Sequence, residues 1–155
     1  MKEIFGEYIR AIYRNEDNTY LAFIRNDRRF WVYETIGDCC SYSWFESINN
    51  PENIIGERII GIEIKFEDGS LDEQGRFIKS YGWTFKTQKG YTDIEFRNAS
   101  NGYYEGECWH IYDAKLIFPE TSSSCIEPTI ILIAKNGGVK DQTLHLVCPK
   151  PLENE

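Results

Sequence analysis

Apolar and polar residues alternate with a period of two along most of the chain, which is the pattern of strands that bury one face. The clearest case is the segment RIIGIEIKFEDG, residues 58–69. One face of it would carry Arg58, Ile60, Ile62, Ile64 and Phe66, and the other Glu63, Lys65 and Glu67. The pattern predicts a half-buried strand that ends at an Asp-Gly turn, with the apolar face buried.

Runs of the same kind recur at residues 7–14, 19–25, 29–36, 76–87, 91–98, 107–118, 129–136 and 143–148. We therefore predict a mainly β fold: one domain over residues 1–155, a twisted antiparallel sheet or partly closed barrel of roughly eight or nine strands. The loop at 119–128 is the one plausible boundary. Residues 119–155 are predicted as a C-terminal extension packed on the domain, because the strands after this loop are too few to fold alone.

One segment carries helix signals instead. In SYSWFESINNPE, Ser43 and Glu46 have the spacing of a capping box, in which a serine side chain and a glutamate three residues later satisfy the first amides of a helix. Pro51 would end such a helix. This predicts one short helix over about residues 43–50.

Composition and charge narrow the class of protein. Of the 155 residues, 41% are hydrophobic and 15% aromatic, which excludes a disordered chain. The formal net charge of −8 would repel a phosphate backbone, so we expect no nucleic-acid partner. The first ten residues, MKEIFGEYIR, lack the apolar core of a signal peptide, and no apolar run approaches the ~18 residues of a membrane span. These features predict a soluble, cytoplasmic protein with no membrane partner.

Cysteine and histidine offer the only concentrated reactive chemistry. The five cysteines, an odd number, should be mostly free thiols in a reducing compartment, and their spacing lacks the two close pairs of a structural zinc site. Buried structural cysteines are the favoured interpretation, so we expect no metal and no cofactor. Cys108, His110 and Asp113 lie closest together and would be the residues of a small hydrolase or metal enzyme. No nucleophile signature supports that alternative.

Two segments are unusual for simple turns: GDCCSYSW at 37–44 and FRNASNGYYEG at 96–106. The second leaves a strand at Arg97 and passes through an Asn-Gly turn to Tyr103 and Tyr104. A packed β-hairpin is one explanation. The other is a ligand site, since tryptophan or tyrosine beside arginine can hold a flat base and its phosphates. The densest basic stretch, RNDRRF at 25–30, is more typical of a charged hairpin turn.

Together these segments resemble a family of small phage- and prophage-encoded proteins of unknown function, over about residues 30–106. The shared features are a Gly-Asp-Cys-Cys-Ser turn followed by an aromatic residue, an Ile-Ile-Gly step, and an Arg-Asn-x-Ser-Asn-Gly-Tyr-Tyr segment. The matching positions are Gly37, Asp38, Cys39, Cys40, Ser41, Trp44, Arg97, Asn98, Ser100, Asn101, Gly102, Tyr103 and Tyr104. The resemblance implies an accessory protein that blocks a bacterial defence system.

The hypothesis that joins these observations is a non-enzymatic binder that sequesters a small anionic nucleotide signal, either a cyclic nucleotide or a derivative of ADP-ribose. Stacking on the base and polar contacts to the phosphates would hold the ligand. The predicted ligand-binding residues are Asp38, Ser41, Trp44, Arg97, Asn98, Asn101, Tyr103 and Tyr104. One alternative is a protein–protein inhibitor that presents its acidic surface to a host defence protein. Exposed strand edges could also pair between copies of the chain, so a homo-oligomer is a further possibility.

Overall fold

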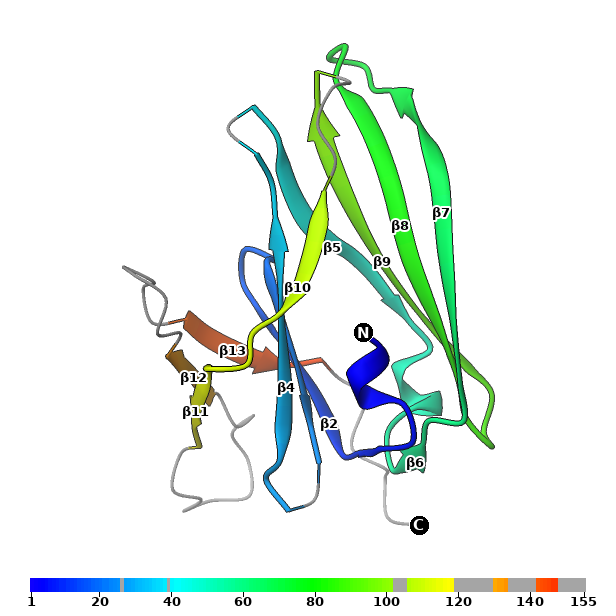
Figure 1. Ribbon diagram of the computed structural model, residues 1–155, viewed down its shortest axis with the longest axis vertical. Helices are drawn as coiled ribbons and strands as arrows, with labels where there is room; N and C mark the ends of the chain where they lie inside the picture. Colours follow the sequence, from blue (N-terminus) through cyan, green and yellow to red (C-terminus); the bar gives the residue numbers. More distant parts are fainter. Residues whose placement is uncertain (26, 39, 102–105, 119–129, 134–141, 148–155) are drawn as a thin grey trace.

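The computed structural model describes residues 1–25, 27–38, 40–101, 106–118, 130–133 and 142–147 (Figure 1). Its elements, in chain order, are η1 (Lys2–Ile4), β1 (Tyr8–Ile9), β2 (Ala11–Asn15), β3 (Tyr20–Ile24), β4 (Phe30–Ile36), β5 (Tyr42–Asn49), η2 (Pro51–Asn53), β6 (Glu57–Arg58), β7 (Gly61–Leu71), β8 (Phe77–Lys86), β9 (Tyr91–Ser100), β10 (Glu107–His110), β11 (Lys115–Ile117), β12 (Ile130–Ile133) and β13 (Gln142–Leu146). The predicted single-domain, mainly β fold is confirmed.

The larger sheet has seven strands in the order β10-β4-β3-β2-β13-β12-β11, and every neighbouring pair is antiparallel. It curls into a half-barrel. All five residues of β3 are buried, so this strand is covered on both faces. The curl explains the double coverage, because β11, β12 and β13 bring Leu132 and Leu144 into one apolar cluster with Ala22 and Val32.

A second sheet, which we call the small sheet, has four antiparallel strands in the order β5-β9-β8-β7, and β1 and β6 form a separate antiparallel pair. Its inner face packs on the other side of the large sheet and forms the main core, as the strand alternation requires. This core joins Phe45, Phe85, Ile94 and Phe96 of the small sheet to Ile12, Leu21, Phe23, Trp31 and Tyr33 of the large one. Its outer face carries the alternate, mostly polar residues and holds the candidate site described below.

The predicted helix at 43–50 is wrong, because this segment is strand β5, paired with β9. Ser43 and Phe45 are buried while Tyr42 and Glu46 are exposed, so burial follows the period of a strand. The Ser43 hydroxyl donates to the carbonyl of Ile36 instead of capping a helix. Among the described residues the helical structure is limited to two short 3-10 turns, and Pro51 begins the second of them. None of the helices in this part of the chain has the length and apolarity to cross a membrane.

A strand was predicted correctly at the position of β7, but its end and the burial of its apolar face were not, because β7 continues through the expected Asp-Gly turn to Leu71. Ile64 is 80% exposed and Phe66 is 52% exposed, although both lie on the inner face of the small sheet. The reason is position: β7 is the outermost strand of its sheet, and in Figure 1 it forms the right-hand border of the molecule, away from the large sheet. Alternation identifies the two faces of a strand, but it does not show whether another sheet lies over the apolar one.

Candidate functional site

The outer face of the small sheet brings together residues from four strands in rows that the strand register defines. One row joins Trp44 on β5, Arg97 on β9, Ser80 on β8 and Glu67 on β7. The row nearer the β4–β5 turn has Tyr42 and Ala99 as its first two members. Two hollows lie along this face, one at the end near that turn and one in the middle of the sheet.

The β4–β5 turn positions the first hollow. An added Cβ at Gly37 would lie 2.5 Å from the carbonyl oxygen of Ser41, so only glycine fits where the chain passes so close to itself. The backbone amide of Asp38 donates to the Ser41 hydroxyl at 2.8 Å, and the Ser41 amide donates to the Asp38 carbonyl at 3.0 Å. The turn therefore fixes Ser41 and the start of β5 at the end of the sheet.

We call the first hollow the turn-end hollow. It has a volume of about 460 Å³ and is lined by Cys40, Ser41, Tyr42, Gly75, Arg76, Ala99, Ser100 and Asn101. Of the predicted site residues, it brings together Ser41 and Asn101. Asp38 lies in the adjoining turn, while Tyr103 and Tyr104 lie outside the described residues.

Aromatic and basic side chains meet at the turn-end hollow. Tyr42 and Trp44 stack with ring centroids 4.7 Å apart and planes 24° apart, and Tyr42 remains 53% exposed. The Arg76 Nε donates to Asp72 at 2.8 Å, and this bond raises the pKa of the guanidinium, which stays charged. A flat aromatic surface and a fixed positive charge therefore share one cavity.

Asn98 supports this hollow from inside the sheet. Its side chain is fully buried, and its amide donates to the Ser43 hydroxyl at 2.9 Å and to the Tyr42 carbonyl at 3.3 Å. Thr35 of β4 donates to the Ser43 carbonyl at 3.0 Å, which extends the network to the large sheet. Asn98 thus holds β5 against β9, beneath the surface on which Tyr42 lies.

Arg97 lies on the outer face, but carboxylates already surround it. Its guanidinium donates to Glu95 at 2.8 Å and lies 3.3 Å from Glu46, and the bond to Glu95 raises its pKa. The indole of Trp44 donates to the same Glu46. An incoming anion would have to compete with both carboxylates for Arg97, whereas Arg76 has one carboxylate partner, Asp72, among the ion pairs of the described residues.

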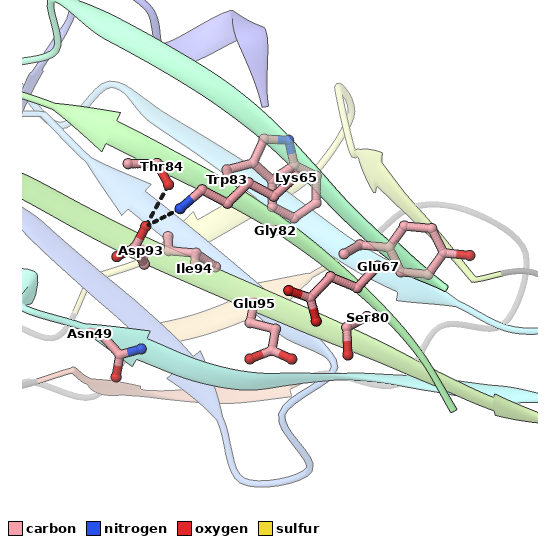
Figure 2. Close-up of a pocket in the computed structure, with 11 residues that line it drawn as sticks. Asn49, Lys65, Glu67, Ser80, Gly82, Trp83, Thr84, Asp93, Ile94 and Glu95 are labelled. Atoms are coloured by element: carbon pink, nitrogen blue, oxygen red, sulfur yellow. Dashed lines mark hydrogen bonds and ion pairs between the residues drawn. The ribbon is translucent and has the colours of Figure 1, made fainter. Parts of the chain in front are cut away.

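The second hollow, which we call the acidic notch, lies over Gly82 and has a volume of about 240 Å³ (Figure 2). Its lining includes three carboxylates, Glu67, Asp93 and Glu95, against one cation, Lys65. Lys65 lies 3.5 Å from Asp93, which also accepts a hydrogen bond from Thr84. The notch exists because residue 82 has no side chain. A Cβ there would fit without a clash, at ordinary contact distances from Ile94 and Lys65, and would occupy part of the notch.

The alternative enzymatic site does not form an activated pair. Burial raises the pKa of the Cys108 thiol to about 12, so the thiol is protonated at neutral pH. Burial also lowers the pKa of His110, whose ring packs on Tyr33 and Tyr112. Across the described part of the chain, no three His, Cys, Asp or Glu side chains are grouped so that they could hold a metal ion. Cys39, Cys125 and Cys148 fall outside that part.

Sequence reasoning missed Tyr42, Arg76 and Gly82. The signal for Tyr42 was present, because residues 42 and 44 share a face once the segment is a strand, but the helix prediction concealed it. Arg76 and Gly82 belong to a β7–β8–β9 meander whose register depends on an irregularity between Glu67 and Ser70. An added Cβ at Gly69, within it, would lie 2.0 Å from the Ile78 carbonyl oxygen, so the chain bends there only because residue 69 is glycine.

These features define a single-domain all-β protein with two surface hollows on one sheet and, in its described residues, no activated nucleophile. The chain belongs to a family described as a domain of unknown function, DUF7448, whose model matches residues 2–109. The match includes both unusual segments and ends within β10, so β11, β12 and β13 lie beyond it. Neither the curated proteins nor the solved structures contain a significant match to this chain.

Proposed function

We propose that this protein is a non-catalytic binder that takes a planar, anionic ligand of the nucleotide class in the turn-end hollow. The observation that carries the proposal is that Tyr42, which is stacked on Trp44, lines the same hollow as Arg76. An aromatic face supplies sequence-tolerant stacking for a base, and a guanidinium is well suited to a phosphate. The volume of about 460 Å³ falls within the range typical of small-ligand sites.

Polar groups complete this arrangement. Ser41, Ser100 and Asn101 give part of the lining of the hollow a polar character, which suits a sugar or the edge of a base. Stacking, one fixed positive charge and a few polar contacts are chemistry for capturing a ligand intact. In line with the phage resemblance, we propose that the ligand is a cyclic nucleotide or ADP-ribose-derived immune signal, which the protein would withdraw from a defence system.

The test is a thermal-shift screen against cyclic dinucleotides, cyclic ADP-ribose isomers and ADP-ribose conjugates. A ligand at ~100 times its Kd should stabilise the fold by ~2.7 kcal/mol. Tyr42→Ala and Arg76→Gln should abolish the shift. Their matched controls are Tyr91→Ala, a tyrosine of equal exposure on the same sheet, and Lys86→Gln, an exposed cation at the other end of β8. Recovery of a chemically altered nucleotide after heating would refute a non-catalytic role.

A second candidate, protein–protein inhibition, is favoured by the acidic notch. Glu67, Asp93 and Glu95 would suit a lysine or arginine side chain from a basic partner segment. Gly82→Val should fill the notch and reduce binding to an arginine-rich peptide without altering the thermal shift with nucleotides. If the peptide binds equally well to this variant, the notch is not the binding site. Because the two hollows have separate lining residues, the two candidates can fail independently.

A further inference from the structure

The free edge of β7 has the features of a self-pairing strand. From Gly61 to Glu67 the strand pairs regularly with β8, and no other strand in the described part of the chain pairs with it. Proteins usually protect such an edge with short strands, proline, charged side chains, bulges or covering segments. In β7 the bulge lies beyond Glu67, and the charges from Glu63 to Glu67 alternate in sign, so they do not simply repel another strand. Here the edge strand is long, and Ile64 and Phe66 are 80% and 52% exposed, respectively. Another strand could therefore approach this edge.

We propose that a second copy of this chain pairs with that edge, antiparallel to it, with the two-fold axis passing through Ile64. The sequence I-E-I-K-F around this residue is self-complementary under such an axis. Ile64 meets Ile64 of the second copy, and Ile62 meets Phe66 of the second copy on the apolar inner face. On the outer face Glu63 meets Lys65 of the second copy, and the symmetry makes this ion pair twice.

Charge selects this register against its neighbours. A shift that centres the axis on residue 65 places Lys65 directly opposite Lys65, and one that centres it on residue 63 places Glu63 opposite Glu63. Like charges directly opposite each other are destabilising in a sheet. Centring on Phe66 would pair Lys65 with Glu67, but it would place Ile64 and Ile62 opposite residues 68 and 70, where β7 leaves its regular register. The axis through Ile64 alone combines opposite charges with three apolar cross-strand pairs.

The dimer would have one continuous eight-stranded sheet, with the outer faces of both copies on the same side. Lys65 is 60% exposed and 3.5 Å from Asp93, so it lies where it can also pair with Glu63 of the second copy. The two acidic notches, one strand in from each β7, would lie about 14 Å apart, given a spacing of ~4.8 Å between strands. This pairing does not depend on the proposed ligand.

The test is sedimentation velocity over a concentration series, combined with charge exchange. Wild-type protein should shift from monomer to dimer as concentration rises. Glu63→Lys and Lys65→Glu should each be monomeric, because each creates two like-charge pairs, while the double exchange should restore the dimer. Circular dichroism of each variant confirms folding, which the exposure of both positions favours. A double variant that stays monomeric would refute this register, and a wild-type protein that is monomeric throughout would refute the dimer.

Cysteine cross-linking tests the position of the axis. Ile64→Cys should form a disulfide-linked dimer on mild oxidation, because residues facing each other across strands have Cα separations within the range of a disulfide. Phe66→Cys is the matched control, since it would face Ile62 and have no thiol opposite it. Wild-type protein gives the background from the native cysteines. Equal cross-linking of the two variants would overturn the axis through Ile64.

Discussion

Replacing Asn98 by alanine tests whether this residue builds the turn-end hollow or contacts a ligand. The side chain is fully buried and donates two hydrogen bonds, at 2.9 Å to Ser43 and 3.3 Å to Tyr42. Each lost bond is worth roughly 0.5–1.5 kcal/mol, and the carbonyl of Tyr42 loses this donor. With the small cavity added, we expect Asn98→Ala to lower the free energy of unfolding by about 2–4 kcal/mol.

The assay is thermal unfolding, monitored by differential scanning calorimetry. For a chain of this length each kcal/mol corresponds to about 2–4 °C in Tm, so the loss should be roughly 5–15 °C. The control is Gln74→Ala, which removes an exposed amide side chain in the β7–β8 turn and should change stability by less than ~0.5 kcal/mol. If Asn98→Ala melts like the wild type yet no longer binds a nucleotide that the wild type binds, the structural role assigned to Asn98 is wrong.

Three further predictions address the rest of the fold. Leu144 belongs to the cluster that covers the second face of β3, and Leu144→Ala should lower the free energy of unfolding in urea by about 3–5 kcal/mol. Ile131 is 41% exposed, and Ile131→Ala should lower it by less than ~1 kcal/mol. Cys108 should resist iodoacetamide at mildly alkaline pH while exposed Cys40 reacts, as peptide mass spectrometry would show; equal labelling would contradict the raised thiol pKa. Burial lowers the pKa of His110 in the folded state, so as the pH falls below 6.5 the unfolded state binds this proton before the folded state does. The Tm of the wild-type protein should therefore fall with pH in this range, and the Tm of His110→Gln should fall less steeply.

The strands could be predicted from the sequence because their signal is local. In β9, for example, Thr92, Ile94 and Phe96 are buried and alternate with Asp93, Glu95 and Arg97, as the pattern indicates. The error at 43–50 arose because Ser43 and Glu46 also satisfy the local rule for a helix start. Pairing with β9 decides the structure of that segment, and the partner lies about fifty residues further along the chain. No local rule contains that information.

The candidate site was predictable only in part for the same reason. The two unusual segments do converge, since Trp44 and Arg97 are directly opposite each other in the register. Whether an arginine is available to a ligand depends on its neighbours in the folded sheet. Glu46 lies beside Arg97 on the adjacent strand β5, and Glu95 lies beside it on β9 itself. Arg76 comes from a turn that carries no sequence signal of a binding site. Its place beside Tyr42 follows from the meander that folds β7 and β8 back along β9.

The position of β13 beside β2 has a consequence for how the chain folds during synthesis. Strands β2, β3 and β4 can form their hairpins as soon as they leave the ribosome, but Asn15 of β2 pairs with Leu144 of β13. The inner strands of the large sheet must therefore wait, with one edge open, until residues 142–146 have been made. Contacts so distant in sequence slow folding and leave edges exposed to other chains. Strand β13 thus closes the half-barrel last. We expect a nascent chain that still lacks β13 to aggregate through the open edge of β2.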